Sequence, residues 1–350
     1  MLQYCHMDRI LEYRVEPHDI AATSGGLLGK ILNNCMGLTS HEISHVKFTP
    51  GGITILREGS AGPLPTPVTV KSKVQPGDLI RVLFADPVEE AAEKVPPVKG
   101  ELAILYEDED VIVLNKPAGL VSHPSHGHHR DTLANFLAGY YEGKGMGGRL
   151  RVVGRLDKDT SGVILFAKSA MAAARLFKQK DKGECRKTYL AVTEGTGLHE
   201  AGADNFNKNA ICGESAALEG TDRSVSREDD RNAGWQEISL PLGPVPWSLA
   251  KQQVLAPPAG KPALTRYVCL GEKEGYSLIK AEIETGRTHQ IRVHMAAIGH
   301  PLMGDPLYGT PSEHAARALL HASQLIFLQP FSGKEIRVTA PLPEDMKLYF

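Results

Sequence analysis

The chain has 350 residues, 42% of them hydrophobic, and a formal net charge of -2, so it is long enough for two domains or for one large domain with an appendage. Its five cysteines are scattered and none forms a CxxC pair, which argues against a disulfide framework or a thiolate zinc site. No stretch approaches the roughly 20 apolar residues of a membrane-spanning helix and no signal peptide is recognisable, so we expect a cytoplasmic protein.

The near-neutral net charge hides an uneven distribution along the chain. Residues 149–190 contain eleven Lys or Arg and four Asp or Glu, whereas residues 196–235 contain eight acidic and four basic residues. The basic stretch is typical of a surface that contacts nucleic acid, although a solvated helix face is the alternative. We expect residues 196–235 to form a flexible acidic insertion that masks this basic character.

Residues 1–85 are predicted to form a small N-terminal α/β module. SGGLLGKILNNCMG (24–37) and TSHEISHVKF (39–48) have the pattern of two short helices, with Ser24 and Thr39 as N-caps. TPGGITI and QPGDLIRVLF predict strands after them. Residues 86–100 are rich in Pro, Glu and Ala, which is typical of an interdomain linker.

Residues 101–350 alternate strand and helix patterns. ELAILYEDEDVIVLNKP (101–117) predicts two strands joined by an acidic turn, and VILFAKS (163–169) predicts a buried strand followed by a helix capped by Ser169. That helix is expected to bury the stripe Ala170, Ala173, Ala174 and Phe177. TYLAV, TRYVCL and SLIKAEIET predict further strands, and GRTHQIRVHMAAIG (286–299) predicts a helix. The fold class expected is α+β, with a mixed, mainly antiparallel sheet.

The segment RLDKDTSG (155–162) places a polar cluster directly before a buried strand. Asp157 could act as a nucleophile, a general base or a metal ligand, or it could simply cap the turn that Thr160, Ser161 and Gly162 form. The segment alone leaves these alternatives open.

A second cluster, TGRTHQIRVH (285–294), interleaves cationic and apolar residues. On a helix, Arg287, Gln290, Ile291 and His294 would share one side. The apolar neighbours indicate that the helix is packed, and a packed arginine needs a carboxylate partner. We expect Asp157 to be that partner.

These segments, with KTYLAV (187–192), GKPALTRY (260–267), MGDPLYG (303–309) and LHASQLIFLQPFSGKEIRVTAPLP (320–343), occur in the order typical of one enzyme family. The chain resembles an RluA-type pseudouridine synthase, an RNA uridine isomerase. The resemblance implies a sheet core with a central catalytic cleft for residues 101–350, an S4-like RNA-binding module for residues 1–85, and no cofactor or metal. It also implies an RNA substrate, ribosomal large-subunit RNA ahead of transfer RNA, and we expect a monomer.

The resemblance further implies roles for individual residues. Asp157 corresponds to the catalytic carboxylate, Tyr189 to the residue that contacts the target base, and Arg292 to the arginine that pairs with the aspartate. The expected substrate-binding residues are Arg155, Leu156, Thr160, Arg287, His289, Gln290 and Ile291. Gly154 departs from the family, many members of which have a histidine there.

The chemistry of uridine isomerisation is consistent with these residue types. The N1–C1′ bond must break, and the carboxylate can either attack C1′ or stabilise an oxocarbenium-like sugar and remove the C2′ proton. An aromatic ring such as Tyr189 could hold the detached uracil by stacking, although a core tyrosine is the alternative. The base must leave its stack, so flanking phosphates need to be held, and a basic run could do this. That run comprises Arg175, Lys178, Lys180, Lys182, Arg186 and Lys187.

Two competing hypotheses remain at this point. The first is a non-catalytic RNA-binding or ribosome-assembly protein with the same fold. The second is a metal-dependent hydrolase using the histidine-rich loop HPSHGHHRD (123–131), although a Pro/Gly loop is a poor scaffold for metal ligands, and a surface loop near RNA is the favoured interpretation.

Overall fold

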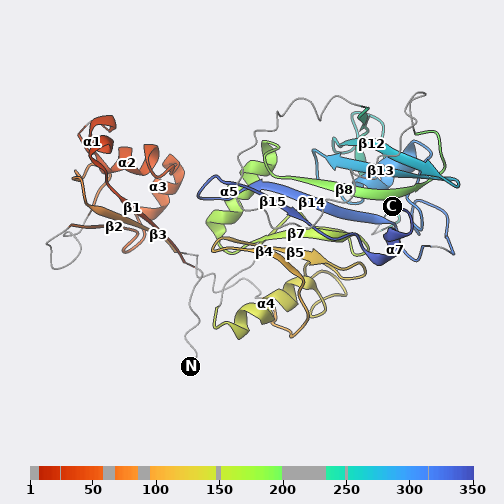
Figure 1. Ribbon diagram of the computed structural model, residues 1–350, viewed down its shortest axis with the longest axis horizontal. Helices are drawn as coiled ribbons and strands as arrows, with labels where there is room; N and C mark the ends of the chain where they lie inside the picture. The colour runs from red at the N-terminus through yellow and green to blue at the C-terminus, as the bar shows by residue number, and fades with distance from the viewer. Residues whose placement is uncertain are drawn as a thin grey trace.

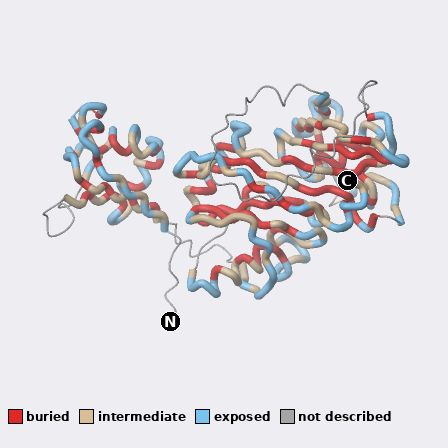
Figure 2. Tube along the Cα trace, viewed as in Figure 1, coloured by how far each residue is buried: buried red, intermediate tan, exposed pale blue. Residues whose placement is uncertain are grey.

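The computed structural model of the chain describes residues 8–23, 25–57, 68–85, 95–146, 151–198, 234–248, 251–313 and 315–350. Its buried apolar side chains form one core within residues 15–84 and, in the rest of the chain, one large core and two smaller ones. Figure 2 shows the buried residues gathered in two bodies, the N-terminal unit and the rest of the chain. The predicted linker 86–100 and insertion 196–235 lie mostly outside the described residues.

The N-terminal unit is a three-stranded antiparallel sheet with three short helices (Figure 1). Its sheet order is β1-β3-β2. The elements are β1 (Arg9–Arg14), α1 (Pro17–Ala22), α2 (Leu28–Asn34), α3 (Ser40–Val46), β2 (Ile53–Leu56) and β3 (Leu79–Phe84). Thr39 is the N-cap of α3, as predicted. Its side chain accepts a hydrogen bond from the Glu42 amide. Leu27 rather than Ser24 precedes α2, and Ser24 lies outside the described residues.

The main body is built on a ten-stranded sheet, in which β4-β5-β7-β14-β8-β13-β12-β9 are neighbours and β6 and β15 pair with β7 and β14. All pairs are antiparallel except β7 with β14. The strands are β4 (Ile104–Glu107), β5 (Val111–Lys116), β6 (Arg151–Val153), β7 (Ser161–Ala167), β8 (Arg186–Glu194), β9 (Gln236–Ser239), β12 (Leu264–Lys273), β13 (Tyr276–Ile283), β14 (Leu320–Leu328) and β15 (Glu335–Thr339). The predicted α+β class with a mixed, mainly antiparallel sheet is confirmed.

Helices and a small hairpin surround this sheet. They are α4 (Leu133–Gly143), α5 (Ala170–Asp181), α6 (Gln290–Ala297), α7 (Glu344–Lys347) and the pair β10 (Leu242–Pro244) and β11 (Gln252–Val254). In Figure 1, α4 lies beside β4 and β5, and α5 lies at the end of the sheet that faces the N-terminal unit. None of the helices in the described ranges is long and apolar enough to span a bilayer.

The cap of α5 was predicted correctly, but its buried stripe was not. The Ser169 hydroxyl accepts a hydrogen bond from the Ala172 amide and starts the helix. The helix buries Ala172, Ala173, Leu176 and Gln179, whereas Ala174 and Phe177 are exposed. The helix is therefore rotated from the predicted stripe, because Leu176 and the side-chain amide of Gln179 dock on the sheet, where Gln179 bonds the backbone of Leu328.

Candidate active site

Asp157 lies in the loop between β6 and β7. The Thr160 amide donates a hydrogen bond to the Asp157 backbone carbonyl at 3.2 Å, which closes the turn. The half-buried carboxylate itself forms no hydrogen bond or ion pair with any residue that the structure describes. The alternative in which Asp157 caps the turn is therefore wrong, and its carboxylate is available to a ligand.

A single cleft of about 1140 Å³ opens beside this loop. All ten predicted site residues line it, although they come from three separate parts of the chain. They are Arg155, Leu156, Asp157, Thr160, Tyr189, Arg287, His289, Gln290, Ile291 and Arg292. The structure thus brings together the residues of the RLDKDTSG, KTYLAV and TGRTHQIRVH segments.

Buried polar side chains form hydrogen bonds to the backbone of the Asp157 loop. The ammonium group of Lys116, which is fully buried, donates to the backbone carbonyls of Pro117, Leu120 and Lys158 at 2.7–2.9 Å. The Ser122 hydroxyl donates to the Leu156 carbonyl at 2.7 Å. Burial lowers the pKa of Lys116 to about 7, whereas its three acceptors and the charges of Asp159 and Asp157 favour the ammonium form. Sequence analysis missed Lys116, and its position at the end of a buried strand was the available signal.

The far end of the loop is fixed against β14. Gly162 has φ +108°, and a side chain there would collide with the Ala322 backbone. The Ser161 hydroxyl is hydrogen-bonded to the buried His321 ring at 2.9 Å. Arg317 donates to the Asp159 carbonyl and forms an ion pair with Asp345 of α7. The loop that carries the carboxylate is therefore held at both ends.

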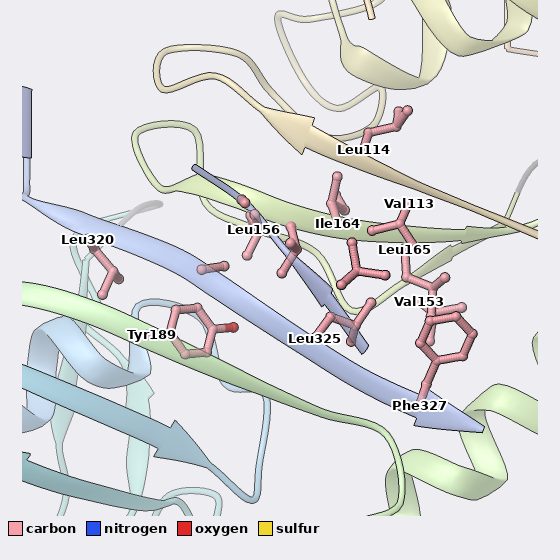
Figure 3. Close-up of a cluster of buried hydrophobic side chains, with 14 of the residues drawn as sticks. Val113, Leu114, Val153, Leu156, Ile164, Leu165, Tyr189, Leu320, Leu325 and Phe327 are labelled. Atoms are coloured by element: carbon pink, nitrogen blue, oxygen red, sulfur yellow. The ribbon is translucent and has the colours of Figure 1, made fainter. Parts of the chain in front are cut away.

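Tyr189 is both a core residue and a cleft residue. It lies on β8, opposite Ala281 of β13 and Ala322 of β14, and its side chain is buried. Figure 3 shows its ring in the same apolar cluster as Leu156, over β14. Burial raises the pKa of the Tyr189 hydroxyl, and the charge of Asp157 raises it further.

The predicted partner of Arg292 is wrong. Its guanidinium forms a buried bidentate pair with Asp305, with Nε–Oδ2 2.6 Å and Nη2–Oδ1 2.7 Å, and no ion pair joins it to Asp157 within the described residues. Burial alone would lower the pKa of Arg292, but the hydrogen bonds to Asp305 and the charges of Asp305 and Asp157 raise it. Asp157 therefore lies near a cation that already has its own counter-ion.

The helix predicted over residues 286–299 begins later than expected. His289 has φ 55° and ψ 22°, a left-handed conformation, and α6 starts at Gln290. Arg287 therefore lies outside the helix, where its guanidinium donates to the Pro262 carbonyl. The buried Gln290 side chain accepts from Thr285 and donates to Leu264, and the His289 ring is hydrogen-bonded to Tyr308 at 2.9 Å.

The other predicted residues differ in exposure. Leu156, Thr160 and Ile291 are buried at the wall of the cleft. Arg155 is exposed and forms no hydrogen bond or ion pair with the described residues, so its guanidinium is available to a ligand.

The six basic residues from 175 to 187 do not form one surface. Arg175 forms an ion pair with Glu42 of the N-terminal unit, and Lys178 is exposed and does not line the cleft. The other four line the cleft: Lys180, Lys182, Arg186 and Lys187.

The histidine-rich loop has a different organisation from a metal site. The His128 ring is hydrogen-bonded to Asp131 at 2.6 Å, and His123 lines the cleft. Across the described ranges, no three His, Cys, Asp or Glu side chains are grouped as metal ligands would be.

Comparison with known proteins places this site in a family. The family described as RNA pseudouridylate synthase matches residues 110–297. The chain belongs to this family. An RNA pseudouridine synthase of Bacillus subtilis (strain 168) is 37% identical over 276 residues, which cover 78% of each chain. Ribosomal large subunit pseudouridine synthase D of Zymomonas mobilis is 36% identical over 262 residues, covering 71% of this chain and 72% of that protein.

A solved structure, Human RNA Pseudouridylate Synthase Domain Containing 1, is 24% identical with a TM-score of 0.49, covering 70% of this chain and 85% of that one. The predicted resemblance to RluA-type pseudouridine synthases is confirmed, and the chain is an RNA pseudouridine synthase, an isomerase. The S4-like character of the N-terminal unit stays a prediction.

Proposed function

We propose that this pseudouridine synthase isomerises specific uridines of large-subunit ribosomal RNA, with Asp157 as the catalytic carboxylate. The observation that carries the proposal is the half-buried Asp157 carboxylate, which lies in a large cleft without a partner among the described residues. The relatives named ribosomal large subunit pseudouridine synthase D support the choice of RNA, and transfer RNA is the alternative.

The proposed reaction has three stages at this carboxylate. The N1–C1′ bond of the bound uridine breaks, the uracil turns while it is held, and C5 forms a bond to C1′; the C5 proton is lost to solvent and N1 takes up a proton. Asp157 either attacks C1′, giving an ester that C5 later displaces, or removes the C2′ proton from an oxocarbenium-like sugar and returns it when C5 bonds to the sugar. In both routes the loop anchored by Lys116 and Ser122 keeps the carboxylate at a fixed position.

The remaining cleft residues would hold the two halves of the substrate. The Tyr189 ring supplies an apolar surface for the detached uracil. Arg155, which has no partner among the described residues, is free to take the place of the extruded nucleotide or to contact its phosphate. The charge of Arg292 is paired with that of Asp305. Arg292 therefore contributes a fixed dipole and a nearby cation to Asp157, but forms no ion pair with it within the described residues.

Release of tritium from RNA labelled at uridine C5 tests this function, because among the three candidate functions only the isomerase displaces that hydrogen. We expect wild-type protein to release the label and Asp157→Asn to abolish release while binding the same RNA. Release should survive EDTA, which distinguishes the isomerase from a metal-dependent hydrolase. Binding without release by the wild-type protein would favour the non-catalytic alternative.

The rest of the assignment follows from this reaction. We propose that the protein acts in the cytoplasm as a monomer, and that residues 1–85 are an S4-like RNA-binding domain joined by residues 86–100 to the catalytic domain of residues 101–350. Mapping pseudouridines in a strain that lacks the gene identifies the RNA. Loss of a site in transfer RNA alone would contradict the ribosomal assignment.

A further inference from the structure

Two lysine ammonium groups converge at one point of the cleft, beside Gly154. The Lys187 Nζ donates to the Gly154 carbonyl at 2.9 Å. A side-chain carbon at Gly154 would lie 3.7 Å from the Lys187 Nζ and equally far from the Lys180 Nζ. The two ammonium groups are therefore separated by at most twice that distance. Lys180 also reaches Gly286, in the loop before α6.

Within the described part of the chain, neither lysine forms an ion pair with an acidic residue. Burial lowers the pKa of Lys187 to about 8; Cys185 opposes this shift, and the positive charge of Lys180 lowers the pKa by a smaller amount than either. Two like charges held together in a half-buried place are unfavourable unless an anion binds between them.

We propose that Lys180 and Lys187 bind one phosphodiester group of the RNA, adjacent to the target nucleotide. This site rests on the proposed function, because it gives the substrate of the same cleft. Gly154 precedes Asp157 by three residues, a stretch that spans at most about 11 Å. A phosphate beside Gly154 is therefore within reach of the nucleotide whose sugar contacts Asp157.

Three features make the place suitable for a phosphate. The ammonium groups come from different elements, α5 and β8, so they approach from two sides. Gly154 and Gly286 have no side chains, which leaves the space between the lysines open. Lys182 and Arg186 line the same cleft and extend the positive charge along it.

The salt dependence of RNA binding tests the site. The probe is an in vitro transcript of large-subunit ribosomal RNA on which the wild-type protein releases tritium. For Lys180→Gln and Lys187→Gln, we expect the slope of log K against log salt to fall by about 0.7 each, as for one lost phosphate contact, and weaker binding at low salt. Lys180→Arg should retain the wild-type slope.

Lys178→Gln is the matched control, because Lys178 is exposed on the same helix and does not line the cleft. It should leave the slope unchanged. Equal slopes for Lys180→Gln, Lys187→Gln and wild type would overturn the phosphate site while leaving the isomerase intact. Failure of the wild-type protein to release tritium from any RNA would instead remove the proposed function.

A measurement on the wild-type protein avoids any effect of substitution on folding. Acetylation by acetic anhydride, read by mass spectrometry, should modify Lys180 and Lys187 in the free protein and spare them when the transcript is bound. Lys178 should react in both. Equal protection by inorganic phosphate at the same ionic strength would show a general anion site and contradict an RNA backbone contact, as would unchanged reactivity with RNA.

Discussion

Two charged residues of the cleft, Asp157 and Arg292, differ in whether their side chains have ion-pair partners. Asp157 has no partner among the described residues, whereas Arg292 is buried and bound through two hydrogen bonds to Asp305. Asp305 also accepts hydrogen bonds from the amides of Leu307 and Tyr308. The Asp157 carboxylate therefore has no partner among the described residues, whereas the Arg292 guanidinium is held in place by Asp305.

The buried pair predicts a large effect on stability. Asp305→Asn would leave the Arg292 guanidinium buried without a counter-ion, so we expect the free energy of unfolding to fall by about 3–5 kcal/mol. Asp345→Asn is the comparison, because Asp345 pairs with Arg317 but is half exposed, and we expect a loss of about 1 kcal/mol. Urea denaturation at neutral pH measures both. Equal losses would mean that burial does not set the strength of the pair.

Sequence could identify these residues but not their pairing. The motif segments selected ten residues that the fold brings to one cleft. They did not reveal that Arg292 contacts Asp305 rather than Asp157, because only the tertiary structure determines which of the two acids the arginine reaches. The support from Lys116 was missed for a similar reason, since its acceptors are backbone carbonyls, which leave no trace in side-chain patterns.

At the scale of elements, the site depends on the junction of β7 with β14, the single parallel pair among the strand pairings of the described ten-stranded sheet. Ser161 lies opposite His321 in this pairing, and the buried His321 ring bonds the Ser161 hydroxyl. The junction thus fixes the point at which the Asp157 loop enters the sheet.

The His321 ring predicts a pH dependence of stability. Burial lowers its pKa to about 4, and the Arg317 charge acts in the same direction, against the Ala340 backbone and Asp345. An unfolded histidine has a pKa of about 6.5, so between these values the unfolded state binds more protons. The free energy of unfolding should therefore fall as the pH is lowered from about 6.5 towards 4, by on the order of 3 kcal/mol.

The contribution of His321 is isolated by comparing variants. His321→Gln should flatten the decrease between pH 6.5 and 4.5, measured by urea denaturation at each pH. His45→Gln, on the exposed side of α3, should retain the wild-type dependence. If His321→Gln shows the same pH dependence as wild type, another group is responsible.

Periodicity and caps predicted most elements, and local backbone conformation explains the failures. The strand β13 and the caps at Thr39 and Ser169 were predicted correctly from the sequence. The start of α6 was not, because the left-handed conformation of His289 is imposed by its surroundings and not by its residue type. Likewise β1 was not predicted, since RILEYR becomes a strand by pairing with β3.

At the scale of the whole molecule, the N-terminal unit is attached to the main body through a specific contact. Arg175 of α5 forms a bidentate pair with Glu42 of α3, at 2.6 and 3.0 Å, and donates to the Pro330 carbonyl. The Phe331 ring lies near both the Arg175 and the Arg9 guanidinium groups. In Figure 1, α3 is the helix of the N-terminal unit that lies towards the end of the main body that carries α5.

This contact gives the N-terminal unit a fixed position relative to the cleft. Arg9 of β1 adds ion pairs to Glu109 and Asp110, in the turn between β4 and β5. α5 carries Arg175 towards the N-terminal unit and Lys180 into the cleft. An RNA that contacts both parts would therefore meet them in one geometry, and α5 is the element that relates them.

A double-mutant cycle on Glu42 and Arg175 tests the strength of this attachment. We expect Glu42→Gln and Arg175→Met to show a coupling free energy of about 2–3 kcal/mol in urea denaturation, because Glu42 is buried and the hydrogen bonds are charged. The cycle on Glu12 and Arg81, an exposed ion pair within the N-terminal unit, should give less than about 1 kcal/mol. If both cycles gave the same small coupling, the two units would not be held by this pair, and the orientation of the N-terminal unit relative to the main body would have to come from other contacts, such as those of Arg9, or from the bound RNA.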